Sequence, residues 1–126
     1  EWPRDEWRPV AVAIPDGRYP KAERRALRVV GDSMDEIYPD GSYIIYVSLN
    51  EIGRRPQQGD RVVVLRHRHD QVEATVKEYQ RDGQGKRWLV PRSSNPAHAP
   101  FRLQQPIDDG ETIEVVGLVV GSQRLE

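Results

Sequence analysis

Short apolar runs, each closed by turn-forming residues, recur along the chain. Valine, isoleucine and aromatic residues dominate these runs, which is typical of β-strands. Turn signals such as Asp82-Gly83 recur about every ten residues, as in antiparallel sheets, sandwiches and partial barrels. The pattern therefore predicts a mostly β fold of compact antiparallel sheets with about seven short strands. We expect these strands at residues 10–14, 26–30, 43–47, 61–65, 71–80, 88–90 and 113–120.

The run at residues 71–80 alternates most clearly between apolar and polar positions. Because successive side chains of a strand point to opposite faces, Val72, Ala74 and Val76 should share one face. The opposite face should carry Glu73, Thr75, Lys77 and Tyr79.

The segments between the runs predict one or two helical turns and several loops. Residues 22–25 could form one helical turn. Asp32 or Ser33 could cap another whose first turn holds Asp35 and Glu36. Residues 51–58 and 91–106 are predicted loops, and residues 67–70 a polar hairpin tip. Gly117 should break the last strand, and Trp88 should lie in the core.

Composition narrows the function classes. The 126 residues fit one domain, and the 19 Lys and Arg against 20 Asp and Glu argue against a dedicated nucleic-acid binder. The chain has no cysteine, which excludes disulfides, a thiol nucleophile and thiolate zinc sites. No apolar run approaches the roughly 18 residues of a membrane span. The chain starts at Glu1 rather than Met, so we expect a fragment or processed product of a longer protein.

Ser33 and Lys77 are the candidate catalytic pair. Ser33 lies between a predicted strand end and a predicted helical turn, where its hydroxyl and nearby backbone N–H groups would be exposed. A serine hydroxyl needs a base, and a lysine can serve if burial lowers its pKa. Thr75 shares the strand face of Lys77 and could orient its amine. From residue types alone, a capping serine and a solvated lysine are the favoured interpretation of these two positions.

Other residue clusters have simpler readings. His67 and His69 could share a strand face, but no third metal ligand is evident and a solvated turn is favoured. Ser94 and Asn95 are typical turn formers. A small basic cluster, more simply a solvated face than a partner site, consists of Lys21, Arg24, Arg25 and Arg28.

Six ordered segments resemble the LexA-like and phage-repressor self-cleaving peptidase domains. Residues 29–34 (VVGDSM) resemble the nucleophile motif, and residues 75–79 (TVKEY) the segment with the general-base lysine. The others are residues 38–45, 59–64, 91–96 (PRSSNP) and 115–121, so the resemblance covers about residues 26–122. We accordingly expect a lead-in with the cleavage-region counterpart at residues 1–25 and the Ser-Lys peptidase and dimerisation domain at residues 26–126.

The resemblance implies that Ser33 attacks the scissile carbonyl, that Lys77 takes its proton, and that amides near Asp32 and Ser33 hold the oxyanion. Thr75, Asp32 and Met34 would be supporting residues. It implies no cofactor and no metal. It further implies a cytoplasmic homodimer stimulated by a RecA–single-strand filament, with DNA bound through an N-terminal helix-turn-helix domain absent from this chain.

The sequence departs from the family at the cleavage site. The family cuts itself at an Ala-Gly or Cys-Gly bond, and neither dipeptide occurs here. The nearest counterpart is Asp16-Gly17. Either the site lies before Glu1, or the domain does not cut itself, or it cuts in trans.

Three hypotheses remain at this level. The first is a self-cleaving regulatory domain, and the second is the same fold used only for dimerisation or sensing. The third, disfavoured without a membrane anchor, is a peptidase acting on other proteins.

Overall fold

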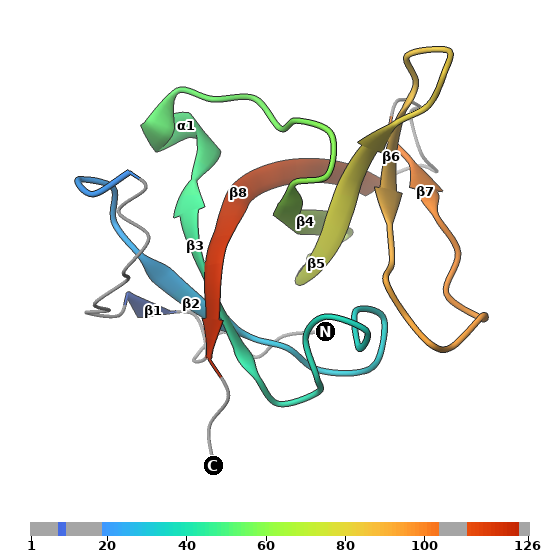
Figure 1. Ribbon diagram of the computed structural model, residues 1–126, viewed down its shortest axis with the longest axis horizontal. Helices are drawn as coiled ribbons and strands as arrows, with labels where there is room; N and C mark the ends of the chain where they lie inside the picture. The colour runs from blue at the N-terminus through green and yellow to red at the C-terminus, as the bar shows by residue number, and fades with distance from the viewer. Residues whose placement is uncertain (1–7, 10–18, 104–110, 124–126) are drawn as a thin grey trace.

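The computed structural model describes residues 8–9, 19–103 and 111–123. Within them the chain forms one antiparallel sheet with the strand order β1-β2-β3-β8-β4-β5-β6-β7 and one short helix (Figure 1). The mostly β prediction is confirmed. The elements are β1 (Arg8–Pro9), β2 (Arg25–Arg28), β3 (Tyr43–Ser48), α1 (Leu49–Ile52), β4 (Arg61–Arg68), β5 (Gln71–Arg81), β6 (Arg87–Val90), β7 (Phe101–Arg102) and β8 (Glu111–Gln123).

The sheet curls so that its two halves meet. β8 pairs with β3 on one side and with β4 on the other, and the register shifts in both pairings. Such shifts mark β-bulges, which bend a strand and increase its twist. Three strands separate β2 from β5 in the sheet order. The loop between β2 and β3 nevertheless lies beside the lower end of β5 in Figure 1.

This β2–β3 loop is anchored by its own apolar side chains. Met34 and Tyr38 are buried in a core cluster with Leu27, Ile44 and Val76. Burial of a side chain of this size contributes about 1.5–3 kcal/mol. The backbone of the loop also turns tightly, since Tyr38 N–H donates to the Met34 carbonyl at 2.7 Å. The core therefore fixes the residue that follows Ser33.

Several expectations about local structure were wrong. Residues 22–25 form no helical turn, because Arg25 already pairs with Tyr46 of β3. The segment after Asp32 is a series of turns rather than a helix. There the Glu36 N–H donates to the Arg92 carbonyl at 3.0 Å, outside its own segment.

The short helix lies instead within the predicted 51–58 loop and just before it. Ser48 caps it by accepting a hydrogen bond from the Glu51 N–H at 3.2 Å, and Gly53 ends it in a left-handed conformation. The Ser48-Leu49-Asn50-Glu51 sequence is a capping-box pattern, followed by a helix-ending glycine. This signal was present in the sequence and was missed.

The later strands differ from expectation in three ways. β8 continues through Gly117 rather than breaking there. The glycine lets Tyr46 pack against the strand, since a Cβ at this position would lie 2.5 Å from Tyr46 Cδ2. The 91–106 loop contains the two-residue strand β7. The predicted 67–70 tip is shorter, since His67 and Arg68 belong to β4. The predicted strand at residues 10–14 lies outside the described residues.

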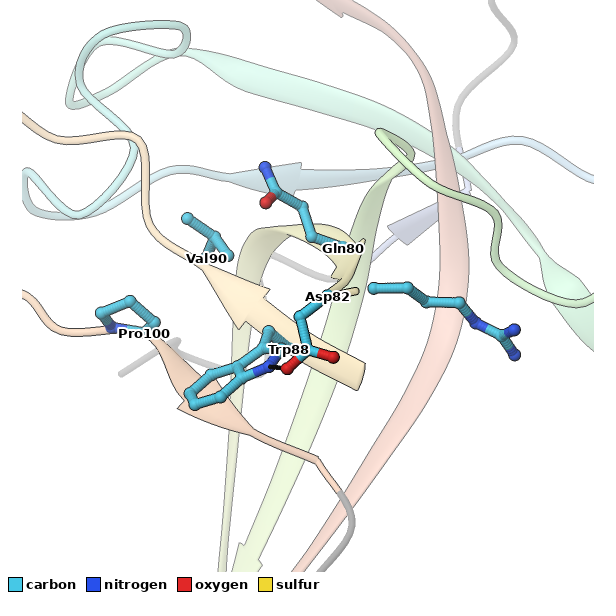
Figure 2. A pocket seen from close by; sticks show the side chains of 6 residues that line it. Gln80, Asp82, Trp88, Val90 and Pro100 are labelled. Atoms are coloured by element: carbon cyan, nitrogen blue, oxygen red, sulfur yellow. Dashed lines mark hydrogen bonds between the residues drawn. The ribbon is translucent and has the colours of Figure 1, made fainter. Parts of the chain in front are cut away.

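Trp88 is only partly buried, and its indole N–H donates to Asp82 Oδ2 at 3.0 Å, so the core placement was wrong. It lines a surface hollow at the end of β5 and β6. Figure 2 shows Gln80, Val90 and Pro100 around it. Across the described part of the chain, no helix has the length and apolar character needed to traverse a bilayer.

Candidate active site

β5 and the β2–β3 loop bring Lys77 and Ser33 together. Lys77 Nζ donates to Ser33 Oγ at 3.2 Å and to Thr75 Oγ1 at 2.9 Å. Thr75 is two residues before Lys77 on the same strand, so both side chains point to the same face of β5. The third contact of the amine is the Val76 carbonyl at 3.3 Å. The expected alternation of β5 therefore places Thr75 and Lys77 on one face, and the β2–β3 loop brings Ser33 within hydrogen-bond distance of the amine.

The environment of Lys77 disfavours a charged amine. Burial lowers its pKa from 10.5 to about 8. Its hydrogen-bond partners in the described chain are two hydroxyls and a carbonyl, so no carboxylate stabilises the ammonium. At pH 8 about half of the molecules would hold a neutral amine, which can accept a proton. This arrangement can activate the Ser33 hydroxyl.

Backbone geometry holds Ser33 at a sharp change of direction. Gly31 has a φ of 92°, a conformation that side-chain-bearing residues rarely adopt. Its N–H donates to Asp40 Oδ1 at 2.8 Å, which closes the base of the loop. Within the described residues the N–H groups of Ser33 and Met34 have no acceptor. These two donors flank the Ser33 hydroxyl and could receive an oxyanion.

The predicted supporting residues have different surroundings. Met34 is 1% exposed and packs in the core, where its sulfur accepts a hydrogen bond from the Arg92 N–H at 3.2 Å. Asp32 does not contact Lys77 and faces the 91–98 segment. Its carboxylate accepts from Asn95 Nδ2 at 3.1 Å and lies 2.6 Å from His98 Nε2. The His98 and Asn95 contacts, in that order, lower the pKa of Asp32.

The 91–98 segment is bound to the nucleophile loop at several further points. The Asp35 carboxylate accepts from the Ser94 N–H at 2.8 Å and from the Ser94 hydroxyl at 2.7 Å. Ser93 Oγ donates to the Asp32 carbonyl at 2.5 Å. Sequence reasoning favoured a turn-forming role for Ser94 and Asn95 over a functional one through the family loop, and it missed His98. The similarity of residues 91–96 to a family loop was the signal available.

A buried carboxylate ties this segment to β5. Glu78, which follows Lys77, has a side chain only 7% exposed and pairs with Arg92, whose Nη2 lies 2.6 Å from Glu78 Oε2. Arg92 is the main reason that the pKa of Glu78 is lowered. The Glu78 side chain points to the face opposite Lys77, because adjacent strand residues alternate. Its charge therefore pairs with Arg92 of the 91–98 segment and does not contact the Lys77 amine.

The other candidate clusters do not form a site. His67 lies 3.4 Å from Glu114, while His69 sits exposed in the β4–β5 turn. No group of three metal-ligating side chains occurs in the residues the structure describes. In the basic cluster, Arg25 pairs with Glu23 at 2.8 Å, and the Arg24 guanidinium donates to the Tyr19 and Ala22 carbonyls.

A family model described as Peptidase S24-like matches residues 7–120, which is most of the chain. No curated protein matched.

Proposed function

This chain belongs to the Peptidase S24-like family, and on that premise we propose that it is a self-cleaving regulatory domain. Specifically, it would be the C-terminal domain of a LexA- or phage-repressor-like transcription regulator, cytoplasmic and dimeric. The observation that carries the proposal is the 3.2 Å contact between Ser33 Oγ and the amine of Lys77, whose pKa burial lowers to about 8. A solvated strand lysine would show neither feature.

The proposed reaction is acyl transfer through Ser33. The neutral Lys77 amine accepts the Ser33 hydroxyl proton while Oγ bonds to the scissile carbonyl carbon. The N–H groups of Ser33 and Met34 donate to the resulting oxyanion. The C–N bond then breaks, and the Lys77 ammonium returns its proton to the leaving amine. Water, activated by the same amine, hydrolyses the acyl-serine.

Thr75 supports this mechanism by orienting the amine. Its hydroxyl, 2.9 Å from Lys77 Nζ, restricts the lysine to rotamers that reach Ser33. The role follows from geometry, since Thr75 adds no charge and leaves burial as the cause of the lowered pKa of Lys77.

The sequence favours one alternative. Because no Ala-Gly or Cys-Gly pair occurs, the domain could keep the fold for dimerisation or sensing without cutting itself. A RecA–single-strand filament as inducer, and operator binding through a helix-turn-helix domain, belong to the first proposal only.

The test is intact mass against time between pH 7 and pH 10, with and without an activated RecA filament. We expect one cut upstream of Ser33, about five times faster at pH 8 than at pH 7 and nearly constant above about pH 9, following the neutral fraction of Lys77. Ser33→Ala should abolish the cut and keep the dimer in light scattering. Ser122→Ala, an exposed position on β8, is the matched control.

Each outcome points to one candidate. A rate that does not change with pH would contradict Lys77 as the base. No cut under any condition, in a chain that still dimerises, would favour the non-cleaving module.

A further inference from the structure

Ser93 contacts the peptide unit that precedes the nucleophile. Its hydroxyl donates to the Asp32 carbonyl at 2.5 Å, although 61 residues separate the two in sequence. The same hydroxyl oxygen accepts from the Asn95 N–H at 2.9 Å, so both its donor and an acceptor position are used. The Asp35 N–H is a second, longer donor to the Asp32 carbonyl at 3.3 Å.

The orientation of this carbonyl fixes the direction of the Ser33 N–H. The Asp32 oxygen and the Ser33 N–H belong to one planar trans peptide unit, in which they point in opposite directions. Anchoring the oxygen to Ser93 therefore turns the N–H away from the 91–98 segment. That N–H has no acceptor among the described residues.

Three side-chain contacts restrain the segment that carries Ser93. Asn95 Nδ2 and His98 Nε2 lie 3.1 Å and 2.6 Å from the Asp32 carboxylate. The segment therefore contacts Asp32 at both its side chain and its carbonyl. The Arg92–Glu78 pair anchors the segment to β5 next to Lys77. Ser93 thus lies on a loop restrained from both sides of the site.

We propose that Ser93 is a positioning residue, which sets the direction of the Ser33 amide so that this amide can donate to the developing oxyanion. The inference rests on the proposed function, because it assigns the amide a role in Ser33 acyl transfer. Ser93 acts through the Asp32–Ser33 peptide unit and does not touch the substrate.

The experiment measures covalent labelling of Ser33 by a fluorophosphonate, followed by intact mass. Ser33 Oγ displaces fluoride, and the phosphoryl oxygen occupies the place of the oxyanion. The reaction needs no internal cleavage site. The variants are Ser93→Ala, Ser93→Thr, which keeps the hydroxyl, and Ser93→Cys, which keeps the volume but donates weakly. Ser94→Ala, the same change one residue later, is the control.

We expect labelling of Ser93→Ala to be at least about tenfold slower than wild type, and that of Ser93→Cys to fall between them. Ser93→Thr should stay within about threefold and Ser94→Ala within about twofold. The pH midpoint near 8 should not move in Ser93→Ala, because the Lys77 contacts are untouched. A purely structural role would instead be reported by equal losses in Ser93→Ala and Ser94→Ala.

Different results would overturn the positioning role of Ser93 and the proposed peptidase function. If wild type is labelled at Ser33, and Ser93→Ala and Ser93→Cys are labelled as fast as wild type, the role of Ser93 alone is overturned. Wild type that is not labelled at Ser33, or is labelled equally well in Lys77→Met, overturns the proposed function and the inference together.

Discussion

Replacing Lys77 by methionine should stabilise the fold, and more so at low pH. Methionine keeps an unbranched side chain of similar length but carries no charge to bury. The pKa of Lys77 is about 8 in the fold against an ordinary 10.5, so the unfolded chain binds more protons between those values. The contribution of Lys77 to stability therefore rises with pH across this window.

The size of the effect follows from the two pKa values. The charged amine costs the folded state about 3 kcal/mol at pH 7, because 1.36 kcal/mol corresponds to one pKa unit. At pH 10 most unfolded molecules remain protonated but the native amine is neutral, and the cost falls to about 1 kcal/mol. The advantage of Lys77→Met over lysine should thus shrink by about 2–3 kcal/mol between pH 7 and pH 10. The loss of the contacts to Ser33 and Thr75 changes the free energy of unfolding equally at both pH values, so it does not affect this difference.

The assay is urea unfolding at pH 7, 8, 9 and 10, with every protein carrying Ser33→Ala so that self-cleavage cannot interfere. Lys21→Met, the same change at an exposed position, is the matched control. A constant difference for Lys77→Met, or one that grows with pH, would refute the claim that Lys77 is buried at a cost.

Three further substitutions test neighbouring features. Thr75→Val removes the 2.9 Å contact to Lys77 Nζ and should slow Ser33 labelling several-fold with little loss of stability; an unchanged labelling rate would exclude an orienting role. Gly117→Ala places a Cβ 2.5 Å from Tyr46 Cδ2 and should lower the free energy of unfolding in urea by about 1–3 kcal/mol, whereas no loss would show that Tyr46 moves freely. Glu78→Gln should cost about 1–3 kcal/mol at pH 7 in the same assay. Because the pKa of Glu78 is lowered, its stabilisation is present above 4.5 and is lost as pH falls, so the gap to Glu78→Gln should narrow in acid; a gap independent of pH would contradict the pairing with Arg92.

Local pattern was sufficient for much of the fold. The alternation along residues 71–80 predicted β5 and placed Thr75 and Lys77 on one face, because the period of a strand is set by its backbone. Turn signals such as Asp82-Gly83 located hairpins, because turn preference is also a property of neighbouring residues. The errors arose where tertiary contacts decide: Arg25 pairs in a sheet, and Glu36 donates its N–H to another segment.

The candidate site divides in the same way. The sequence predicted Ser33 and Lys77 as the candidate pair through a motif and a resemblance. It predicted Thr75 as their neighbour through its spacing from Lys77. Ser93 and His98 were not predicted, because their partner is Asp32, more than 60 residues away in the chain. Strand periodicity and turn preference report nothing about a contact of that separation. The division of the chain at residues 1–25 and 26–126 stays a prediction.

The sequence by itself determined the mostly β class, the face of β5 that carries the lysine, and the residue types available for chemistry. Only the tertiary structure decided that the sheet curls enough to bring the β2–β3 loop to β5. It also decided that Lys77 is largely removed from water there, with no carboxylate of the described residues bonded to its amine. The physical reason is that strand periodicity and turn preference are properties of neighbouring residues. A lowered pKa, by contrast, depends on which distant groups exclude water from the amine.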